Sequence, residues 1–346
     1  MTQTDGFWKG RRVLVTGAAG LLGGWVTPAL VVAGAEVVGL DIAWYRATMK
    51  RHEGVAVVDG DVRDLAQVRE VLAQGTGVDA VLHLAAQPIV GEANDDPIPT
   101  FDHNIAGTWM VLEASRLARK RPVLVVASSD KAYGDGGAVA YEESMPLRAR
   151  HPYAVSKACT DLLAQTYAES YGLPVVISRC GNLYGGGDLN WSRIVPGTIR
   201  SVLEGQRPLI RSDGTPVRDY LYVEDIAAGM LLLARAIAEH PELAGEAFNF
   251  GGGERLPVIE VVGKILAQMG TQLEPDVRNE ASNEISEQRV GAEKAQRILG
   301  WEPSHSLDDG LGRTIAWYRD AVQAHAQVHR SAGVVAAERL GANMSR

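Results

Sequence analysis

The chain has 346 residues, of which 46% are hydrophobic and 22% are charged, and its net charge at pH 7 is −8. This composition is typical of a soluble globular protein with a sizeable core, and the acidic balance argues against nucleic acid or an anionic membrane as the main partner. No apolar run approaches the ~18 residues of a membrane span, and the N-terminus lacks the apolar core of a signal peptide. The two cysteines, Cys159 and Cys180, have no metal-binding spacing, so we expect free, buried thiols in the cytoplasm.

Strands and helices alternate over the first half of the chain. Apolar runs predict strands at 11–17, 36–41, 55–61, 78–86, 122–129 and 173–182, and helical periodicity predicts helices at 21–35, 64–73, 99–118 and 151–171. Near-continuous apolar strands that alternate with helices indicate a parallel sheet covered on both faces.

The alternation ends after Asn182, where glycines and prolines cluster. Short strands at 208–210 and 247–251 and helices at 223–237, 257–269 and 307–323 follow. We therefore predict an α/β chain with a doubly wound domain at 1–182. A smaller α/β domain is expected at 183–330, with some segments returning to the first domain, and a flexible tail at 331–346.

Three glycines separate the first strand from the first helix. Gly17, Gly20 and Gly23 allow a tight turn and the close approach of a pyrophosphate to the helix N-terminus. Asp41 ends the second strand, where a carboxylate accepts hydrogen bonds from the ribose hydroxyls and repels a 2′-phosphate. The pattern favours NAD over NADP, and the alternative is a purely structural turn.

The ends of the next two strands offer further cofactor contacts. Asp61 and Val62 are suited to frame an adenine, although an acid in this place also serves at a helix N-terminus. Leu84, Ala85 and Ala86 end the fourth strand, and small residues there let the backbone approach a dinucleotide.

A tyrosine and a lysine stand four residues apart on the helix predicted at 151–171. Tyr153 and Lys157 therefore share one face, and a nearby ammonium should lower the pKa of the phenol. Such a pair can remove a hydroxyl proton while a hydride leaves the same carbon. The alternative is an ordinary amphipathic surface helix, but Ser129 at the end of the fifth strand and the upstream glycines favour a catalytic site.

Together these motifs resemble the extended short-chain dehydrogenase/reductase family, whose members mostly act on nucleotide sugars. The resemblance implies a Rossmann-type fold, bound NAD, a nucleotide-sugar substrate and a homodimer formed through the helices at 99–118 and 151–171. It also implies that Ser129 orients the substrate hydroxyl beside Tyr153. It extends the cofactor contacts to Leu22 and Asn104, and it places substrate contacts at Gln87, Asn182, Arg193, Arg211 and Arg218. Glu284 and Arg289 match a nucleotide-contacting region only loosely.

The triplet Ser129-Asp130-Lys131 narrows the resemblance. The nucleotide-sugar 4,6-dehydratases carry Thr-Asp-Glu at this place, the branch that acts on CDP-glucose carries Thr-Asp-Lys, and the 4-epimerases carry small or neutral residues after the hydroxyl. The chain therefore resembles the CDP-glucose 4,6-dehydratase branch most. A nucleotide-sugar 4-epimerase and a non-catalytic NAD-binding regulator are the alternatives.

Elimination of water from a hexose needs an acid for the C6 hydroxyl and a base for the C5 proton. Asp130 is the candidate acid, and Lys131 stands where the resemblance places the base. A neutral lysine can serve as a base, whereas a charged one would keep Asp130 ionised, and the sequence leaves both options open. A surface-turn pair is the remaining alternative. His325 and His329 lack a third ligand, so no metal site is predicted.

Overall fold

A sheet of seven parallel strands forms the centre of the computed structural model, which describes residues 6–44, 53–136, 140–280 and 287–322. The strand order is β10-β6-β5-β4-β1-β2-β3. The strands are β1 (Arg12–Thr16), β2 (Glu36–Asp41), β3 (Val55–Asp59), β4 (Ala80–His83), β5 (Val123–Ala127), β6 (Val175–Cys180) and β10 (Ala247–Phe250). The order reverses direction at β1, so the crevice at the carboxyl ends of β1 and β4 is the expected ligand site of such a sheet.

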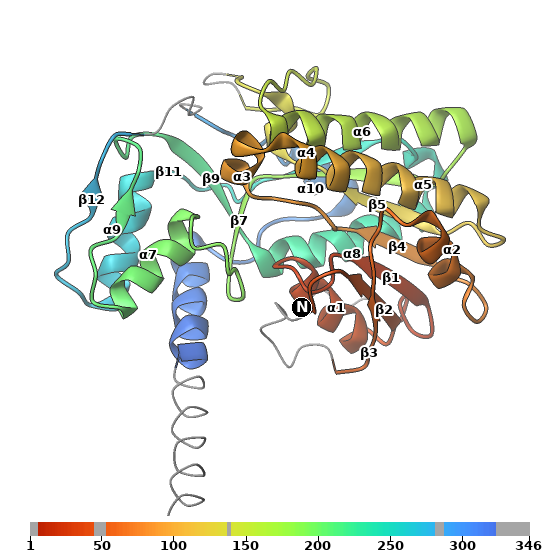
Figure 1. The fold of residues 1–346 in the computed structure, drawn as a ribbon, viewed down its shortest axis with the longest axis horizontal. Coiled ribbons are helices and arrows are strands. Elements are labelled where there is room, and N and C mark those ends of the chain that lie inside the picture. Colours follow the sequence, from red (N-terminus) through yellow and green to blue (C-terminus); the bar gives the residue numbers. More distant parts are fainter. Residues whose placement is uncertain (1–5, 45–52, 137–139, 281–286, 323–346) are drawn as a thin grey trace, which may run out of the picture.

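Helices cover both faces of this sheet, as the alternation predicts (Figure 1). One face carries α2 (Leu65–Ala73), α5 (Gly107–Leu117) and α6 (Pro152–Tyr171), and the other carries α1 (Gly23–Val32) and α8 (Val223–Glu239). Strand β1 shows why both faces are apolar: Val13 and Val15 pack into one buried cluster and Leu14 into the other. The Rossmann-type, doubly wound architecture is therefore confirmed.

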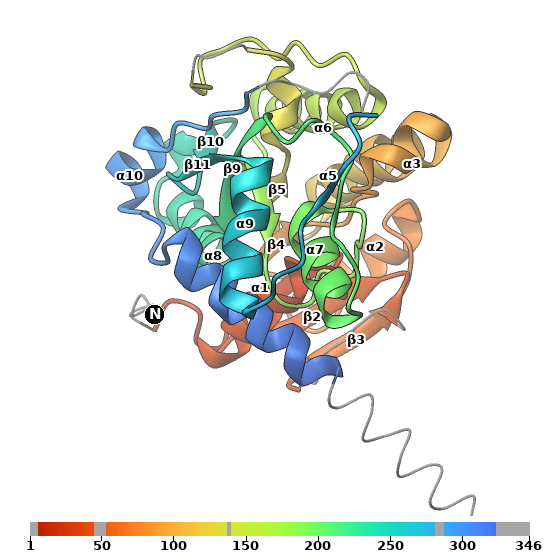
Figure 2. The ribbon, with the colours of Figure 1, turned by 90° about the vertical axis from the view of Figure 1, so that its left-hand side faces the viewer.

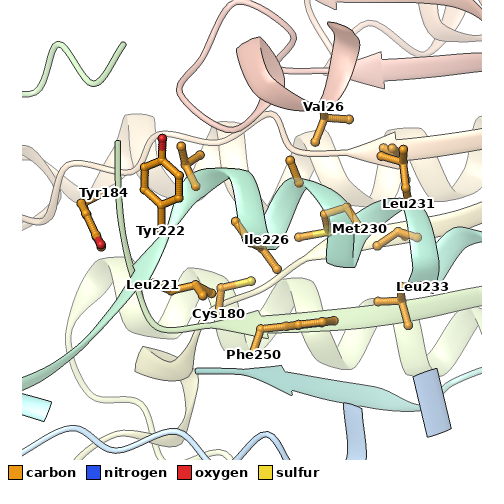
Figure 3. Packing of buried hydrophobic residues seen from close by; sticks show 14 of the residues in the cluster. Val26, Cys180, Tyr184, Leu221, Tyr222, Ile226, Met230, Leu231, Leu233 and Phe250 are labelled. Carbon is orange, nitrogen blue, oxygen red and sulfur yellow. The ribbon is translucent and has the colours of Figure 1, made fainter. Parts of the chain in front are cut away.

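The larger cluster fills the space around α8. Figure 3 shows Ile226 and Met230 of α8 between Val26 of α1 on one side and Cys180 and Phe250 of the sheet on the other. All five side chains are buried. Because α8 packs against β5 and β6, this chain segment beyond residue 182 belongs to the layer that supports the central sheet.

A smaller lobe lies beside the carboxyl edge of the sheet, to the left in Figure 1 and toward the viewer in Figure 2. It contains a three-stranded sheet of β11 (Arg255–Pro257), β9 (Val217–Tyr222) and β7 (Asn182–Tyr184), and a pair formed by β12 (Asp276–Val277) and β8 (Leu209–Ile210). Helices α7 (Ile194–Leu203) and α9 (Val258–Met269) pack together in this lobe. The last described elements are α10 (Glu293–Leu299) and the helix at 307–322.

The helix predicted at 99–118 is in fact a broken series. It comprises α4 (Pro97–Phe101), a π-helical turn η3 (Asp102–Ala106) and α5, and a separate short helix, α3 (Val90–Asp95), precedes it. Asp96 caps α4 by accepting a hydrogen bond from the Ile98 amide, and Pro97 occupies its first turn. A single apolar period does not predict a π-turn, because the wider turn is set by hydrogen bonds from other helices.

Several predictions fall outside the described residues: Glu284, His325, His329 and the tail at 331–346. Both cysteines are free, as predicted, but only Cys180 is buried, whereas Cys159 is partly exposed. Within the part of the chain that the structure describes, no helix is long and apolar enough to cross a membrane.

Candidate active site

The turn between β1 and α1 is closely packed around its glycines. Gly17 has a φ of +68°, and a Cβ atom on it would lie 2.7 Å from the Ala85 amide nitrogen. A Cβ atom on Gly23 would lie 2.2 Å from the Gly17 carbonyl oxygen. The turn therefore brings bare backbone and the N-terminus of α1 to the carboxyl edge of the sheet, a cradle that fits a pyrophosphate. Gly20 and the half-buried Leu22 belong to the same turn.

Asp41 lies at the end of β2 beside this turn. Its carboxylate accepts hydrogen bonds from the Ala19 amide at 2.9 Å and from the Ala43 amide at 2.8 Å. One carboxylate thus joins the second strand to the glycine turn, in the position expected of a ribose acceptor.

The adenine contacts expected at Asp61 and Val62 remain predictions. Asp61 is held by Arg63, whose guanidinium bonds both carboxylate oxygens and lowers the pKa of the acid. Val62 is buried against Gly107 at the start of α5.

The residues that follow β4 line the next part of the edge. Leu84, Ala85 and Ala86 are half-buried. Asn104, in the π-turn, accepts a hydrogen bond from the Gln87 amide at 2.7 Å and donates to the Gln87 carbonyl oxygen and to Ser156. The structure thus shows Asn104 fastening this loop to α6. Its predicted contact with the cofactor, and that of Gln87 with the substrate, stay predictions.

The catalytic candidates come together at the end of β5. Ser129 caps the 3₁₀-helix η4 (Asp130–Tyr133) by accepting from the Lys131 amide at 3.2 Å, and its hydroxyl donates to Asp130 at 2.9 Å. Helix α6 starts at Pro152, which brings Tyr153 to this cap, close enough for the Ser129 hydroxyl to act on the pKa of the phenol. Lys157, one turn along α6, donates to the Ala127 carbonyl oxygen at 2.9 Å.

The prediction that Lys157 lowers the pKa of Tyr153 is wrong for the protein without ligand. Burial raises the pKa of Tyr153 to about 12, and the Asp130 charge raises it further, whereas Arg193 and Ser129 oppose the rise. Burial also lowers the pKa of Lys157 to about 8. Removal from water disfavours both charged forms, and the Lys157 amine is directed to a carbonyl of β5 instead of the phenol.

Lys131 is the centre of a polar cluster between the two lobes. Its amine donates to Asn182 Oδ1 at 3.0 Å and to Gln288 Oε1 at 3.5 Å, and it lies 3.8 Å from Asp130 Oδ1. Asp130 is fully buried, and its second oxygen, Oδ2, has no hydrogen-bond partner among the described residues. An unpartnered buried oxygen in such a cluster is a place for a ligand hydroxyl.

Burial lowers the pKa of Lys131, and the positive charges of Arg218 and Arg193 lower it further. These two arginines, predicted as substrate contacts, therefore face the same cluster. Arg193 precedes α7 and forms an ion pair with Asp188 at 3.0 Å. Arg211, by contrast, is exposed at the end of β8 in the smaller lobe, and its role remains a prediction.

Sequence reasoning missed a buried network that holds η4 in place. Arg179 of β6 bonds Asp161 of α6 at 2.7 and 2.9 Å and the Tyr133 hydroxyl at 2.7 Å, and Tyr133 donates to Asn249 of β10. A charged residue in the apolar run of a central strand was the available signal, because buried charges are paired. Cys180, next on β6, is also part of the site, and burial raises its pKa to about 12.

Comparison with known proteins places this site in a family. Residues 13–251 match the model of the NAD dependent epimerase/dehydratase family. The chain is 29% identical over 337 residues to CDP-glucose 4,6-dehydratase of Salmonella typhimurium, covering 90% of this chain and 92% of that protein. It is 33% identical to dTDP-glucose 4,6-dehydratase of Streptomyces griseus, covering 88% and 93% of the two chains.

Solved structures agree with this relationship. The crystal structure of dTDP-glucose 4,6-dehydratase from Bacillus anthracis in complex with NAD matches with a TM-score of 0.79 and 27% identity, over 90% of this chain and 97% of that one. UDP-glucose 4-epimerase of Thermotoga maritima with UDP-glucose matches with a TM-score of 0.80 and 25% identity, over 89% and 99%. The chain belongs to the NAD dependent epimerase/dehydratase family, within the extended short-chain dehydrogenases/reductases.

Proposed function

We propose that this protein is a nucleotide-sugar 4,6-dehydratase, a lyase that converts an NDP-hexose to its 4-keto-6-deoxy form. The observation that carries the proposal is the buried Asp130, which has an unpartnered oxygen and lies beside the Lys131 amine at the end of β5. Tyr153 reaches the same point from the start of α6, beside Ser129. A reaction that only moves a hydride needs the tyrosine, whereas elimination needs a further acid and base.

Each group has a role that follows from its place. Tyr153, as the phenolate, takes the proton of the C4 hydroxyl while a hydride leaves C4, and Ser129 orients the C4 hydroxyl. Once C4 is a ketone, the C5 proton is acidic, and we assign its removal to the Lys131 amine, whose pKa is lowered by burial. The C6–oxygen bond then breaks, and Asp130 gives a proton to the departing hydroxyl, so that water leaves. The hydride that left C4 finally joins C6, and a proton returns to C5.

The glycine turn and Asp41 fit NAD as the cofactor. Gly17 and Gly23 leave room for a pyrophosphate at the N-terminus of α1, and the carboxylate of Asp41 suits a ribose with free hydroxyls. Lys157 is placed on the same face of α6 as Tyr153 to bind the nicotinamide ribose. When bound, NAD supplies a reversible hydride acceptor.

CDP-glucose is the substrate we propose first. The Ser129-Asp130-Lys131 triplet supports it, as does the similarity to the Salmonella enzyme, while the relatives that act on dTDP-glucose keep that nucleotide a candidate. Arg193 and Arg218 face the cluster around Lys131, and guanidinium groups suit a diphosphate. Asn182, between Lys131 and β9, is suited to the same region.

A 4-epimerase is the second candidate, because an enzyme of that kind has the same fold. Asp130 and Lys131 argue against it, since an epimerase has no use for an elimination acid. We also propose that the chain works as a homodimer in the cytoplasm, which is consistent with its free cysteines.

Mass spectrometry of the products tests the proposal. The purified protein, incubated with CDP-glucose, dTDP-glucose, UDP-glucose or GDP-mannose, is expected to convert one of them to a product that is lighter by one water. An unchanged mass with altered stereochemistry would establish the epimerase instead. No change in any sugar would contradict both functions.

A further inference from the structure

Gln288 is a buried amide on a segment with a firmly held backbone. Its side chain is 2% exposed, and its amide donates to the Val217 carbonyl oxygen at 3.1 Å. The next residue, Arg289, accepts from the Tyr141 amide at 2.8 Å. Bridges to Val217 on one side and Tyr141 on the other thus fix where the Gln288 side chain begins.

The two polar atoms of the Gln288 side-chain amide differ in their hydrogen bonding. The oxygen, Oε1, accepts from the Lys131 amine at 3.5 Å, which is the orientation that a donor-only ammonium requires. The nitrogen, Nε2, is buried and has no hydrogen-bond partner among the described residues. A buried amide normally finds a partner for each polar atom, so an unpartnered donor at this place indicates that a ligand supplies the acceptor.

A second unpartnered atom belongs to Asp130, the other neighbour of the Lys131 amine in this cluster. Asp130 Oδ2 is a buried acceptor without a partner in the described part of the chain, and the other oxygen of the same carboxylate lies 3.8 Å from the Lys131 amine. A donor and an acceptor left open around one amine match the hydroxyl groups of a hexose, each of which both donates and accepts.

We propose that Gln288 is a specificity-determining residue whose Oε1 holds the Lys131 amine and whose Nε2 donates to a hydroxyl oxygen of the bound hexose. The inference rests on the proposed function and adds a contact from a segment that lies 157 residues beyond Lys131 in the sequence. It assigns Gln288 to the sugar and not to the nucleotide, because the Oε1 atom of the same amide group contacts Lys131, which lies beside Asp130.

Two substitutions separate the two roles. Gln288→Met keeps the length of the side chain and removes both polar atoms, whereas Gln288→Glu keeps an oxygen for Lys131 and removes the donor. Calorimetry on the full chain with NAD present would compare the binding of CDP-glucose with that of CDP, and of dTDP-glucose with dTDP. Both variants are expected to bind the nucleotide sugar at least about tenfold more weakly and the nucleoside diphosphate as tightly as before. Gln288→Glu should retain more of kcat than Gln288→Met.

Gln206, which is exposed on the smaller lobe, provides the matched control, and Gln206→Met should change neither value. The proposal would be overturned if Gln288→Met bound the nucleotide sugar as tightly as the original chain does. It would also be overturned if the variant lost as much affinity for the nucleoside diphosphate as for the nucleotide sugar. If circular dichroism shows that Gln288→Met does not fold, the same comparison of nucleotide sugar with nucleoside diphosphate is made with Gln288→Glu, and its result decides. Absence of water loss from the original chain would instead contradict the proposed function alone.

Discussion

Tyr153 shows how one residue depends on its surroundings. Its hydroxyl lies near Ser129, and burial raises its pKa to about 12, so the phenol is protonated at neutral pH until charge is added nearby. With Tyr153 as the proposed base, the positive nicotinamide of bound NAD would lie near the phenol and would favour the phenolate.

Replacement of Tyr153 by Phe should therefore lower kcat by about 10²- to 10⁴-fold, the usual contribution of a general base. NAD affinity, measured by fluorescence titration, should change little because the ring remains. Tyr171→Phe, at the exposed end of the same helix, is the control and should leave kcat unaltered. Full activity of the Tyr153→Phe variant would exclude the assigned role.

Asp130 and Lys131 should affect a later step than Tyr153 does. With Asp130→Asn or Lys131→Met, we expect the 4-keto-6-deoxy product to form about 10²- to 10⁴-fold more slowly, because the elimination has lost its acid or base. The first hydride transfer should persist, so reduced nicotinamide should accumulate and be visible in the absorbance of the enzyme. Asp95→Asn, an exposed carboxylate, is the control. Product formation at the original rate would assign both residues to binding only.

The sequence suggests Ser129, Tyr153 and Lys157 as site residues because their spacing and strand-end position are local, and their catalytic roles stay predictions. Gln288 could not be predicted in this way. It reaches Lys131 only because its segment runs beside Val217 of β9, and a lone glutamine in a polar stretch carries no local signal. Arg179 carries a weak local signal for its buried network, because it is a charged residue within an apolar run.

At the scale of an element, the turn between β1 and α1 depends on the missing side chains of its glycines. A Cβ atom on Gly23 would lie 2.2 Å from a backbone oxygen, whereas one on Gly24, the next residue, would meet nothing within 4 Å. Gly23 and Gly24 therefore provide a test variant and its matched control.

Gly23→Ala is expected to weaken NAD binding by tenfold or more and to destabilise the fold by about 1–3 kcal/mol, as overpacking does. Gly24→Ala should bind NAD normally and match or exceed the original stability, since alanine favours a helix. NAD titration and urea unfolding measure the two effects. Equal behaviour of both variants would contradict the packing described for this turn.

His83 gives β4 a pH dependence. It is buried between Thr16 of β1 at 2.8 Å and Thr108 of α5 at 3.2 Å, and burial lowers its pKa to about 3. Between the ordinary histidine pKa of ~6.5 and this value, the unfolded chain binds one proton more than the folded chain.

The free energy of unfolding should therefore fall as the pH falls through this window, with His83 contributing up to about 1.4 kcal/mol per pH unit. Urea unfolding at several pH values measures the slope. His83→Gln can still bond both threonines but does not titrate, so its slope should be shallower. Identical slopes for the two proteins would show that His83 does not charge on unfolding.

A strong apolar period is enough to predict an element and its approximate length. The helix predicted at 99–118 shows that the period does not predict an irregular turn within an element. Its length was predicted, but its π-turn was not. The Asn104 carbonyl oxygen accepts from Thr108 of the same helical series and from Thr160 of α6, and the second contact has no trace in the local sequence. A turn set by a neighbouring helix is a tertiary feature, and propensity alone does not specify it.

At the scale of the molecule, the sequence indicated two lobes but not which later segments join the sheet. Strand β10 pairs in parallel with β6, with Phe250 opposite Cys180, so residues 247–250 return to the edge of the main sheet. A short run such as "AFNF" does not reveal its partner, because register depends on the neighbouring strand. The domain limits at 182 and 330 stay predictions.

The homodimer proposed above has a candidate interface on neighbouring helices that carry exposed apolar side chains. Ile98 of α4, Trp109 of α5 and Leu162 of α6 are 73%, 41% and 53% exposed, on helices that pack side by side (Figure 1). Exposed apolar side chains gathered on one surface mark an interaction site, and two such helices from each of two chains can form a four-helix bundle.

We expect the chain to sediment as a dimer in analytical ultracentrifugation, and the double variant Trp109→Glu, Leu162→Glu to sediment as a monomer, because charges would be buried between the helices. Val277→Glu changes a similarly exposed residue of the smaller lobe and should remain dimeric. Since α6 carries Tyr153 and Lys157, the monomer should also melt at a lower temperature and turn over more slowly. A double variant that still forms dimers would place the interface elsewhere. A monomeric original chain would contradict the dimer, and α6 would then be held only by its own contacts with β6 and α5.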